Sequence, residues 1–222
     1  MIHPSRCPLC RSPGARAYAE VRARRYVECV RCRLVSLAPE QRPASTAERQ
    51  HYATHENHPA DTRYRAFLDR LALPLVERVP AGAEGLDYGA GPGPTLSVML
   101  AERGFRTAVY DPFFAPDLGP LRRSYDFITC TEVVEHFHSP ADEFDRLNRL
   151  LRPGGWLGVM TEMLREGRAF ADWHYIRDPT HVCFYRPATM VWIAARFGWT
   201  IEFVHRSVVL FRKSLASGFP TV

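Results

Sequence analysis

The stretch LDYGAGPGP, residues 86–94, packs three glycines into five positions directly after an apolar segment. Gly89, Gly91 and Gly93 alternate with Ala and Pro, and an acid, Asp87, precedes them. Glycine has no Cβ, so closely spaced glycines let the backbone turn sharply and approach a ligand. A strand, a glycine-rich turn and a helix in succession are typical of nucleotide-binding sites. We therefore expect a ligand at this turn and an α/β fold around it.

Short apolar segments alternate with helical patterns on both sides of the glycine-rich turn. The segments that indicate buried parallel strands are LDY (86–88), TAVYD (107–111), DFITCT (126–131) and WLGVMT (156–161). Helices are expected over residues 95–103, 139–151 and 187–197, after an amphipathic helix that begins near residue 61. WTIEFVH and SVVLFRK indicate two final strands joined by a short turn. This alternation predicts a doubly wound, mostly parallel sheet that binds its ligand at the carboxyl ends of the strands.

Asp111, at the end of the second expected strand, narrows the choice of ligand. A carboxylate at this place accepts hydrogen bonds from ribose hydroxyls, so NAD and S-adenosylmethionine (SAM) are both candidates. Pro94 stands where the dinucleotide motif has its third glycine, and Pro92 and Pro94 lack the N–H groups that bind a pyrophosphate. SAM carries no phosphate and needs only close backbone approach. A tight turn without a ligand leaves Asp111 unexplained, so we favour SAM.

The motifs in and beyond the turn resemble those of class I SAM-dependent methyltransferases. The resemblance rests on LDYGAGPG, AVYD, YDFITCTEVVEHF and LLRPGGWLGV, and it extends from about residue 61 to the end of the sequence. It implies a methyltransferase with SAM as cofactor and a Rossmann-like sheet of strand order 3-2-1-4-5-7-6. Only residues 112–124 separate Asp111 from the next expected strand, so we expect the third strand to be vestigial.

The same resemblance implies which residues bind the cofactor. They are Asp87, Gly89, Ala90, Gly91, Gly93, Asp111, Pro112, Phe113, Thr131 and Glu132. The glycines are expected to face the methionine part of SAM, Asp87 its amino group and Asp111 its ribose. The acid that the third strand usually supplies to the adenine has no clear counterpart, so Phe113 and Phe114 are expected to stack on the adenine instead.

Two further stretches carry groups suited to the methyl transfer itself. This reaction is a displacement, in which the enzyme aligns donor and acceptor and removes a proton from an oxygen, nitrogen or carbon acceptor. In TEVVEHFH, Glu132 and His136 lie four apart and share a face if a helical turn begins there. In WHYIRDPTHVCFY, residues 173–185, His174 and His181 are the candidate bases, and the aromatic side chains either wall an acceptor pocket or belong to the core. For each histidine the alternative is a structural hydrogen bond.

Four of the six cysteines form the pattern C-x2-C-x18-C-x2-C near the start of the sequence. They are Cys7, Cys10, Cys29 and Cys32. Two CxxC turns supply the four thiolates of a structural zinc site, and so short a segment needs a metal to fold. A pair of disulfides is disfavoured because nothing marks the chain as secreted. A cysteine knuckle before such a domain is similar to the subgroup that contains zinc-bearing sugar methyltransferases and many bacterial proteins of unassigned substrate.

These patterns divide the chain into three parts. Residues 1–38 are expected to form a knuckle resembling a zinc ribbon, residues 39–60 a polar linker or lid, and residues 61–222 the methyltransferase domain. The linker holds three histidines that we expect to line a pocket or face solvent rather than bind a metal, namely His51, His55 and His58.

The net charge of +5 is concentrated in residues 1–33, which hold eight Arg and two Glu. No aromatic RNA-binding motif accompanies this charge, so we expect a small-molecule acceptor rather than a nucleic acid. No apolar run is long enough to span a membrane, and the first residues lack the apolar core of a signal peptide, so we expect a cytoplasmic protein. The alternatives are an RNA methyltransferase that binds its substrate with the knuckle, and an inactive SAM-binding protein that acts through the knuckle.

Overall fold

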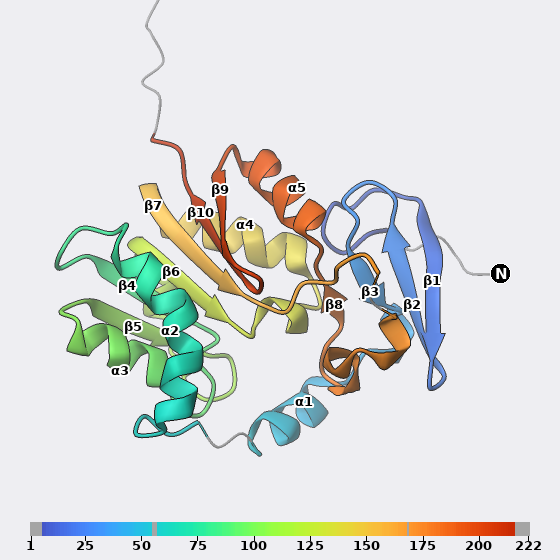
Figure 1. The fold of residues 1–222 in the computed structure, drawn as a ribbon, viewed down its shortest axis with the longest axis horizontal. Coiled ribbons are helices and arrows are strands. Elements are labelled where there is room, and N and C mark those ends of the chain that lie inside the picture. The colour runs from blue at the N-terminus through green and yellow to red at the C-terminus, as the bar shows by residue number, and fades with distance from the viewer. Residues whose placement is uncertain (1–5, 55–56, 168, 216–222) are drawn as a thin grey trace, which may run out of the picture.

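The computed structural model describes residues 6–54, 57–167 and 169–215 and is built around a six-stranded sheet (Figure 1). The strands lie in the order β5-β4-β6-β7-β10-β9. The four parallel strands are β4 (Glu84–Tyr88), β5 (Arg106–Tyr110), β6 (Tyr125–Thr131) and β7 (Leu151–Met160). β9 (Thr200–His205) and β10 (Val208–Arg212) form a hairpin, and β10 joins the sheet antiparallel to β7. The expected mostly parallel α/β sheet is therefore present.

Helices cover both faces of this sheet, because successive residues of a strand point to opposite sides. They are α2 (Thr62–Val76), α3 (Thr95–Glu102), α4 (Pro140–Leu150) and α5 (Pro187–Phe197). α2 and α3 share one core with Phe127 and Trp156 of the sheet, whereas α4 and α5 share the core on the other face with Leu157 and Phe211 (Figure 1). Both faces of the central strands are thus buried, which explains their nearly continuous apolar sequences.

The third strand is missing rather than vestigial. Residues 112–124, all of them described, contain an isolated bridge between Asp111 and Ala115 and a 3-10 helix, Pro120–Arg122, but no strand. Counted along the methyltransferase part with that strand left out, the order is 2-1-4-5-7-6, which is the expected order without its third member. Residues 111–124 return the chain from the carboxyl end of β5 to the start of β6 without forming a strand, so β5 becomes the edge of the sheet.

The N-terminal residues form a second, antiparallel sheet that we call the ribbon. Its strands are β1 (Ala15–Val21), β2 (Arg24–Cys29), β3 (Val35–Leu37) and β8 (Cys183–Phe184), in that order. The fourth strand therefore comes from the methyltransferase part of the chain. Tyr26 and Leu34 of the ribbon belong to the same core as Leu157 of the large sheet. The boundary after residue 38 thus separates two sequence patterns that share one core.

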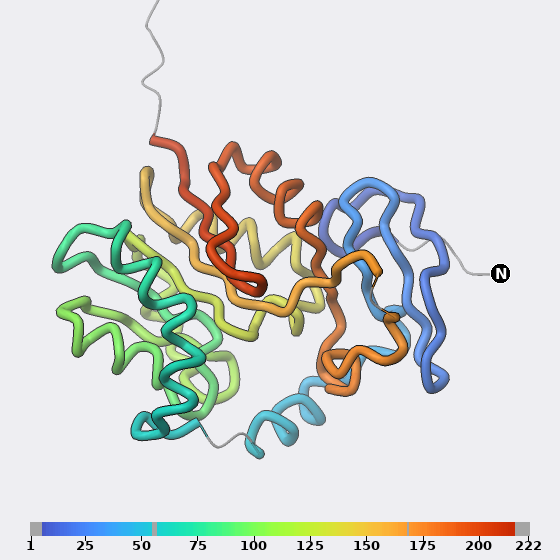
Figure 2. The backbone as a smooth tube through the Cα atoms, viewed as in Figure 1, coloured from blue at the N-terminus to red at the C-terminus, as the bar shows by residue number. Residues whose placement is uncertain are grey.

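The segment between ribbon and α2 was expected to be a linker or lid. It contains a 3-10 helix, Pro39–Gln41, and α1 (Ser45–Tyr52), and α1 lies at the edge of the molecule (Figure 2). His51 pairs with Asp178 at 3.2 Å, whereas His55 lies outside the described residues. No helix in the described part of the chain is long and apolar enough to cross a membrane.

Candidate active site

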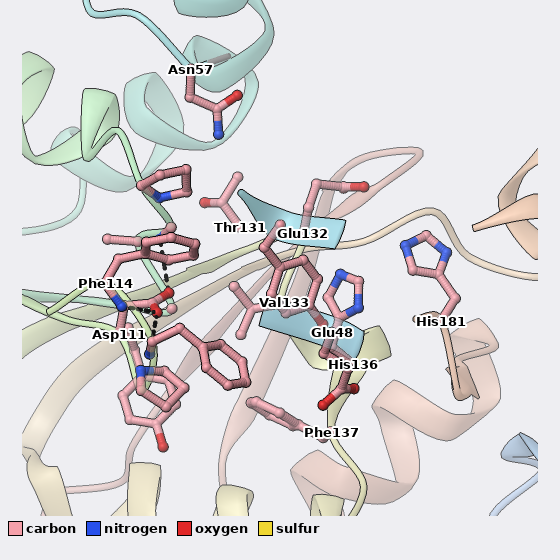
Figure 3. A pocket seen from close by; sticks show the side chains of 18 of the residues that line it. Glu48, Asn57, Asp111, Phe114, Thr131, Glu132, Val133, His136, Phe137 and His181 are labelled. Carbon is pink, nitrogen blue, oxygen red and sulfur yellow. Dashed lines mark hydrogen bonds between the residues drawn. The ribbon is translucent and has the colours of Figure 1, made fainter. Parts of the chain in front are cut away.

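A cavity of about 900 Å³ opens at the carboxyl ends of β4, β5 and β6. Doubly wound sheets bind ligands at this edge, and the volume is near the upper end of the usual range of roughly 300–1,000 Å³. Residues 89–92 and 110–114 line one part of it, which we call the glycine end. The opposite part, which we call the histidine end, is lined by Glu132, His136 and His181 (Figure 3). Tyr175 lines this end as well.

The three glycines of the turn are required for two different reasons. At Gly89, where φ is 80°, a Cβ would lie 2.6 Å from the side chain of Val133. At Gly93, a Cβ would lie 1.9 Å from the carbonyl oxygen of Asn57. At Gly91, where φ is 67°, the nearest atom is Nδ2 of Asn57 at 4.0 Å. Gly89 and Gly93 therefore serve close packing of the protein itself, and Gly91 leaves open space at the cavity.

Asp111 ties together the two loops of the glycine end. Its Oδ1 accepts hydrogen bonds from the N–H groups of Phe113 at 2.8 Å and Phe114 at 3.0 Å (Figure 3). Its Oδ2 accepts one from the N–H of Gly91 at 2.9 Å. The argument that a tight turn alone leaves this acid unexplained is therefore wrong. A carboxylate has about four acceptor positions, so one remains for a ligand.

The other expected cofactor residues divide between the cavity wall and the layer beneath it. Ala90, Pro112 and Thr131 line the cavity, and Oγ1 of Thr131 is buried without a hydrogen-bond partner among the described residues. Asp87 does not line the cavity; it lies beneath the turn, 4% exposed, where it accepts a hydrogen bond from Oγ1 of Thr129 at 2.8 Å. Burial raises the pKa of Asp87 to about 6, although the Thr129 hydroxyl opposes the shift.

We expect Asp87→Asn to stabilise the protein at neutral pH. The carboxyl group has a higher pKa in the folded protein than in the unfolded chain, where it is about 3.9, so the fold favours the protonated form. The stability that this form contributes is present below pH 4 and is lost as the pH rises to about 6. The difference amounts to about 3 kcal/mol at most. Denaturant unfolding should show a more stable variant at pH 7 and equal stabilities near pH 4; equal stabilities at pH 7 would contradict the prediction.

Aromatic rings enclose the glycine end. Phe113 and Phe114 both line it, and the ring of Tyr52, from α1, packs on Phe113 with ring centroids 5.7 Å apart. Flat rings, the open space at Gly91 and the unpartnered hydroxyl of Thr131 together suit a ligand with a planar base and an amino-acid part, such as SAM. α1 thus forms one wall of the cavity.

The backbone directly after β6 shapes the histidine end. Glu132 adopts a left-handed conformation with φ of 53°, a strained state that costs about 1–3 kcal/mol and is common at functional sites. The 3-10 helix Val134–His136 follows, and Glu132 and His136 both line the cavity. Glu135 lies inside this short helix and is fully buried. Sequence reasoning missed Glu135 because it assumed α-helical spacing.

Tyr175 and His181 reach the same place from the loop between β7 and α5. The hydroxyl of Tyr175 lies 3.1 Å from Oε2 of Glu132 and donates a hydrogen bond to Oε1 of Glu135. The ring of His181 packs on Tyr175, with centroids 4.1 Å apart, and on His136, with centroids 4.7 Å apart. Two carboxyl groups, two imidazoles and one phenol therefore form a single cluster.

Burial sets the protonation states in this cluster. It lowers the pKa of His136 and of His181, against the opposing charges of Glu135 and Asp178, so both imidazoles are neutral at neutral pH. Burial and the neighbouring charge of Glu135 raise the pKa of Glu132 well above its usual range, and burial also raises the pKa of Glu135. Perturbed groups gathered in one cavity are typical of acid–base sites.

The remaining predicted residues of the loop lie away from the cluster. The side chain of His174 is 69% exposed at the rim of the cavity and pairs with Glu162 at 3.0 Å. Trp173, Phe184 and Tyr185 are buried in the core and do not line the cavity. Of the two interpretations of these aromatic residues, core packing is therefore the correct one for these three.

Three polar side chains of the cavity wall belong to a cluster that no sequence motif predicts. Tyr88, at the end of β4, donates a hydrogen bond to Glu143 of α4, and Nη1 of Arg146 donates to the Tyr88 oxygen at 2.8 Å. All three side chains line the cavity. No motif marks them, because their meeting depends on how α4 packs against the sheet.

The four cysteines of the ribbon meet in the arrangement expected of a zinc site. All four are buried, and their sulfurs lie within 4.8 Å of one another. The sulfurs of Cys7 and Cys32 are 3.5 Å apart, and those of Cys10 and Cys29 are 3.4 Å apart. A disulfide requires about 2.05 Å, whereas four thiolates around zinc at about 2.3 Å lie roughly 3.8 Å apart. The side chains present therefore fit a zinc ion.

Comparison with known proteins identifies the family. A family model described as a methyltransferase domain matches residues 55–203, more than half of the chain. The chain belongs to this family. The matched residues include the glycine-rich turn, Asp111 and the cluster of the histidine end. The match begins after the four N-terminal cysteines, so it says nothing about them.

Relatives and solved structures agree with this assignment. The chain is 29% identical to a ubiquinone biosynthesis O-methyltransferase of Leptothrix cholodnii over 42% of its length and 52% of the relative's. It is 32% identical to the enzyme of that name from Xylella fastidiosa over 39% of its length and 45% of the relative's, so it spans about half the length of these curated relatives.

A Burkholderia thailandensis 1,6-didemethyltoxoflavin-N1-methyltransferase, solved with bound 1,6-didemethyltoxoflavin and S-adenosylhomocysteine, shares the fold. The TM-score is 0.57 at 17% identity, over 90% of this chain and all of that one. An O-methyltransferase family protein from the same species aligns with a TM-score of 0.50 at 18% identity, over 80% of this chain and 66% of that one. By family the chain contains a methyltransferase domain, and its fold is that of these solved methyltransferases.

Proposed function

We propose that this protein transfers the methyl group of SAM to a small-molecule acceptor that binds at the histidine end of the cavity. The observation that carries this proposal is that one cavity joins an open glycine turn to a cluster of neutral imidazoles and carboxyl groups. Methyl transfer requires donor and acceptor to meet in line within one enclosed space. The cavity also has room for both molecules.

SAM would supply an electrophilic methyl group on its sulfonium, and the residues of the glycine end would position it. Gly91 leaves space for the methionine part, and the free acceptor position of Asp111 suits a ribose hydroxyl. Phe113 and Phe114 are placed to cover the adenine. Asp87, beneath the turn, would bring negative charge towards the amino group, although it does not touch the cavity itself.

Three observations support a small acceptor rather than a nucleic acid. α1 and the loop between β7 and α5 narrow the cavity, and Tyr52 and Tyr175 line it from these two segments. The arginines of the ribbon are largely engaged within the protein, with partners found for Arg6, Arg11, Arg16, Arg24, Arg25 and Arg33. The curated relatives are named O-methyltransferases, which favours an oxygen acceptor.

We expect His136→Gln and His181→Gln to lower turnover and to leave SAM affinity within about twofold of the wild type. Both histidines line the histidine end, away from the glycine turn, and a group that assists proton removal contributes typically 10²–10⁴-fold. Release of S-adenosylhomocysteine, assayed against a panel of small phenols and alcohols, measures turnover, and calorimetry measures SAM affinity. His205→Gln, an exposed histidine on β9, is the control. Full turnover in both variants would leave the two histidines with a structural role only.

We also propose that Cys7, Cys10, Cys29 and Cys32 hold one structural zinc ion. The buried tetrad of free thiols supports this, and so does the small size of the ribbon, which offers little core of its own. The alternative is a domain that binds SAM without transferring its methyl group. Methylation of any acceptor in the turnover assay above would exclude this alternative.

A further inference from the structure

We propose that Glu135, His136 and His181 hold a divalent transition-metal ion, and that the acceptor carries a hydroxyl group whose oxygen binds this ion. One ligand atom from each residue lies within 4.8 Å of the other two. Figure 3 shows His136 and His181 side by side at one end of the cavity. Two imidazoles and one carboxylate are a common ligand set for such ions. Metal binding stands on the structure alone, whereas its part in methyl transfer rests on the proposed function.

Both imidazoles are oriented as metal ligands are. Nδ1 of His136 lies 3.1 Å from the carbonyl oxygen of Thr180, and Nδ1 of His181 lies 2.7 Å from that of Tyr175. A carbonyl oxygen only accepts, so each Nδ1 carries the proton and each Nε2 keeps its lone pair. Histidines bound to metals typically donate their second nitrogen to a carbonyl or carboxylate in this way, which fixes the tautomer and the direction of the ring.

Glu135 supplies the observation that points most directly to a cation. Its side chain has no exposed surface, Tyr175 donates to Oε1, and Oε2 has no hydrogen-bond partner among the described residues. A buried carboxylate oxygen without a partner is costly. The carboxyl group of Glu132 lies at the same phenol, and no Arg or Lys in the described part of the chain pairs with either acid. A bound cation would satisfy the free oxygen and offset the charge.

The position of the cluster leaves room for an acceptor. Three protein ligands do not fill the coordination shell of a transition metal, and His136 and His181 face the cavity. Oδ2 of Asp178 lies 3.8 Å from Nε2 of His181, too far for a hydrogen bond that would block it. Coordination lowers the pKa of a bound hydroxyl group. An acceptor hydroxyl bound to the ion would release its proton to water, and its oxygen would bond to the methyl carbon as the carbon–sulfur bond of SAM breaks. The products would be a methyl ether, S-adenosylhomocysteine and a proton in solution.

The test is a titration of the protein, with its ribbon loaded with zinc, by Mn²⁺, with free Mn²⁺ followed by electron paramagnetic resonance. Mn²⁺ prefers nitrogen and oxygen ligands and does not displace zinc from four thiolates. We expect one Mn²⁺ per chain, and at least tenfold weaker binding in Glu135→Gln and in His181→Gln. Glutamine at position 135 keeps an acceptor for Tyr175, so the fold is retained, and thermal unfolding checks this. His205→Gln should bind Mn²⁺ like the wild type.

Two results would overturn the site: a wild type that binds neither Mn²⁺ nor Co²⁺ beyond its zinc, or Mn²⁺ affinity unchanged in both variants. Elemental analysis should show one zinc per chain in the wild type and in each variant. The Mn²⁺ that a variant no longer binds is then assigned to the histidine end and not to the ribbon. SAM affinity, measured by calorimetry on the same samples without Mn²⁺, separates this proposal from the previous one. If the wild type binds Mn²⁺ at the cluster but does not bind SAM, the metal site stands and the proposed function is refuted.

Discussion

Asp111→Ala is expected to weaken SAM binding by about two orders of magnitude. The free acceptor position of the carboxylate suits a ribose hydroxyl, and a hydrogen bond to a charged group contributes about 1.5–3 kcal/mol, or roughly 10–100-fold. The substitution also removes three hydrogen bonds to the backbone of the loops at the glycine end, so the cavity loses its shape. Calorimetry with SAM measures the loss. NAD should not bind in place of SAM, because Pro92 and Pro94 have no N–H groups that could donate hydrogen bonds to a pyrophosphate.

Asp111→Asn separates the two causes. Its carbonyl oxygen can still accept from Phe113 and Phe114, but its amide group meets the N–H of Gly91 donor to donor. We expect about tenfold weaker SAM binding and a loss of stability of about 1–3 kcal/mol, because one buried donor is left without an acceptor. Asp117→Asn, an exposed acid in the same loop that accepts from Gly119, is the matched control and should bind SAM normally. SAM affinity within twofold of the wild type in Asp111→Ala would confine this acid to a structural role.

The sheet was predictable from sequence because its signals are local. Buried strands with apolar residues on both faces, and helices ended by Gly104 and Gly198 at positive φ, can be recognised without knowing their neighbours. The strand order came from the family resemblance, and it differs from the structure only where residues 112–124 are too few to build a strand. The pairing of β3 with β8 was not predicted, because a two-residue strand has no periodicity to recognise.

The site was predictable only as far as its motifs extend. The glycine turn, Asp111, Glu132 and His136 lie in such motifs, and all of them except Gly93 of the turn line the cavity. The functions of individual residues depend on tertiary contacts that no motif encodes. The Asp111 carboxylate accepts hydrogen bonds from three backbone N–H groups. Gly93 has no Cβ that would collide with the backbone of Asn57. Glu135 was missed because a 3-10 helix, not an α-helix, follows β6.

Removal of the ribbon zinc is expected to lower acceptor turnover by more than tenfold while SAM affinity changes less than about threefold. Structural zinc in small domains supplies about 10–16 kcal/mol of apparent folding free energy, so the ribbon should lose its fixed structure without the ion. Arg24 of β2 donates hydrogen bonds to four carbonyl oxygens of the loop that carries His181, at 3.1–3.4 Å. Tyr26 packs on Phe170, with ring centroids 4.8 Å apart. The ribbon therefore holds the loop of the histidine end in place, whereas the residues of the glycine end follow β4 and β5.

Three variants isolate this coupling. Cys29→Ser should lose zinc and turnover together, and Cys130→Ala, which alters a buried cysteine outside the ribbon, should keep one zinc per chain by elemental analysis. Arg24→Gln should keep the zinc and release only the loop, so turnover falls and SAM affinity stays. Protein purified without a chelator that contains no zinc would refute the ribbon site itself. Full turnover in zinc-free protein would show that residues 1–38 and the methyltransferase domain are independent in function although they share a core, and the hydrogen bonds of Arg24 would then have no catalytic consequence.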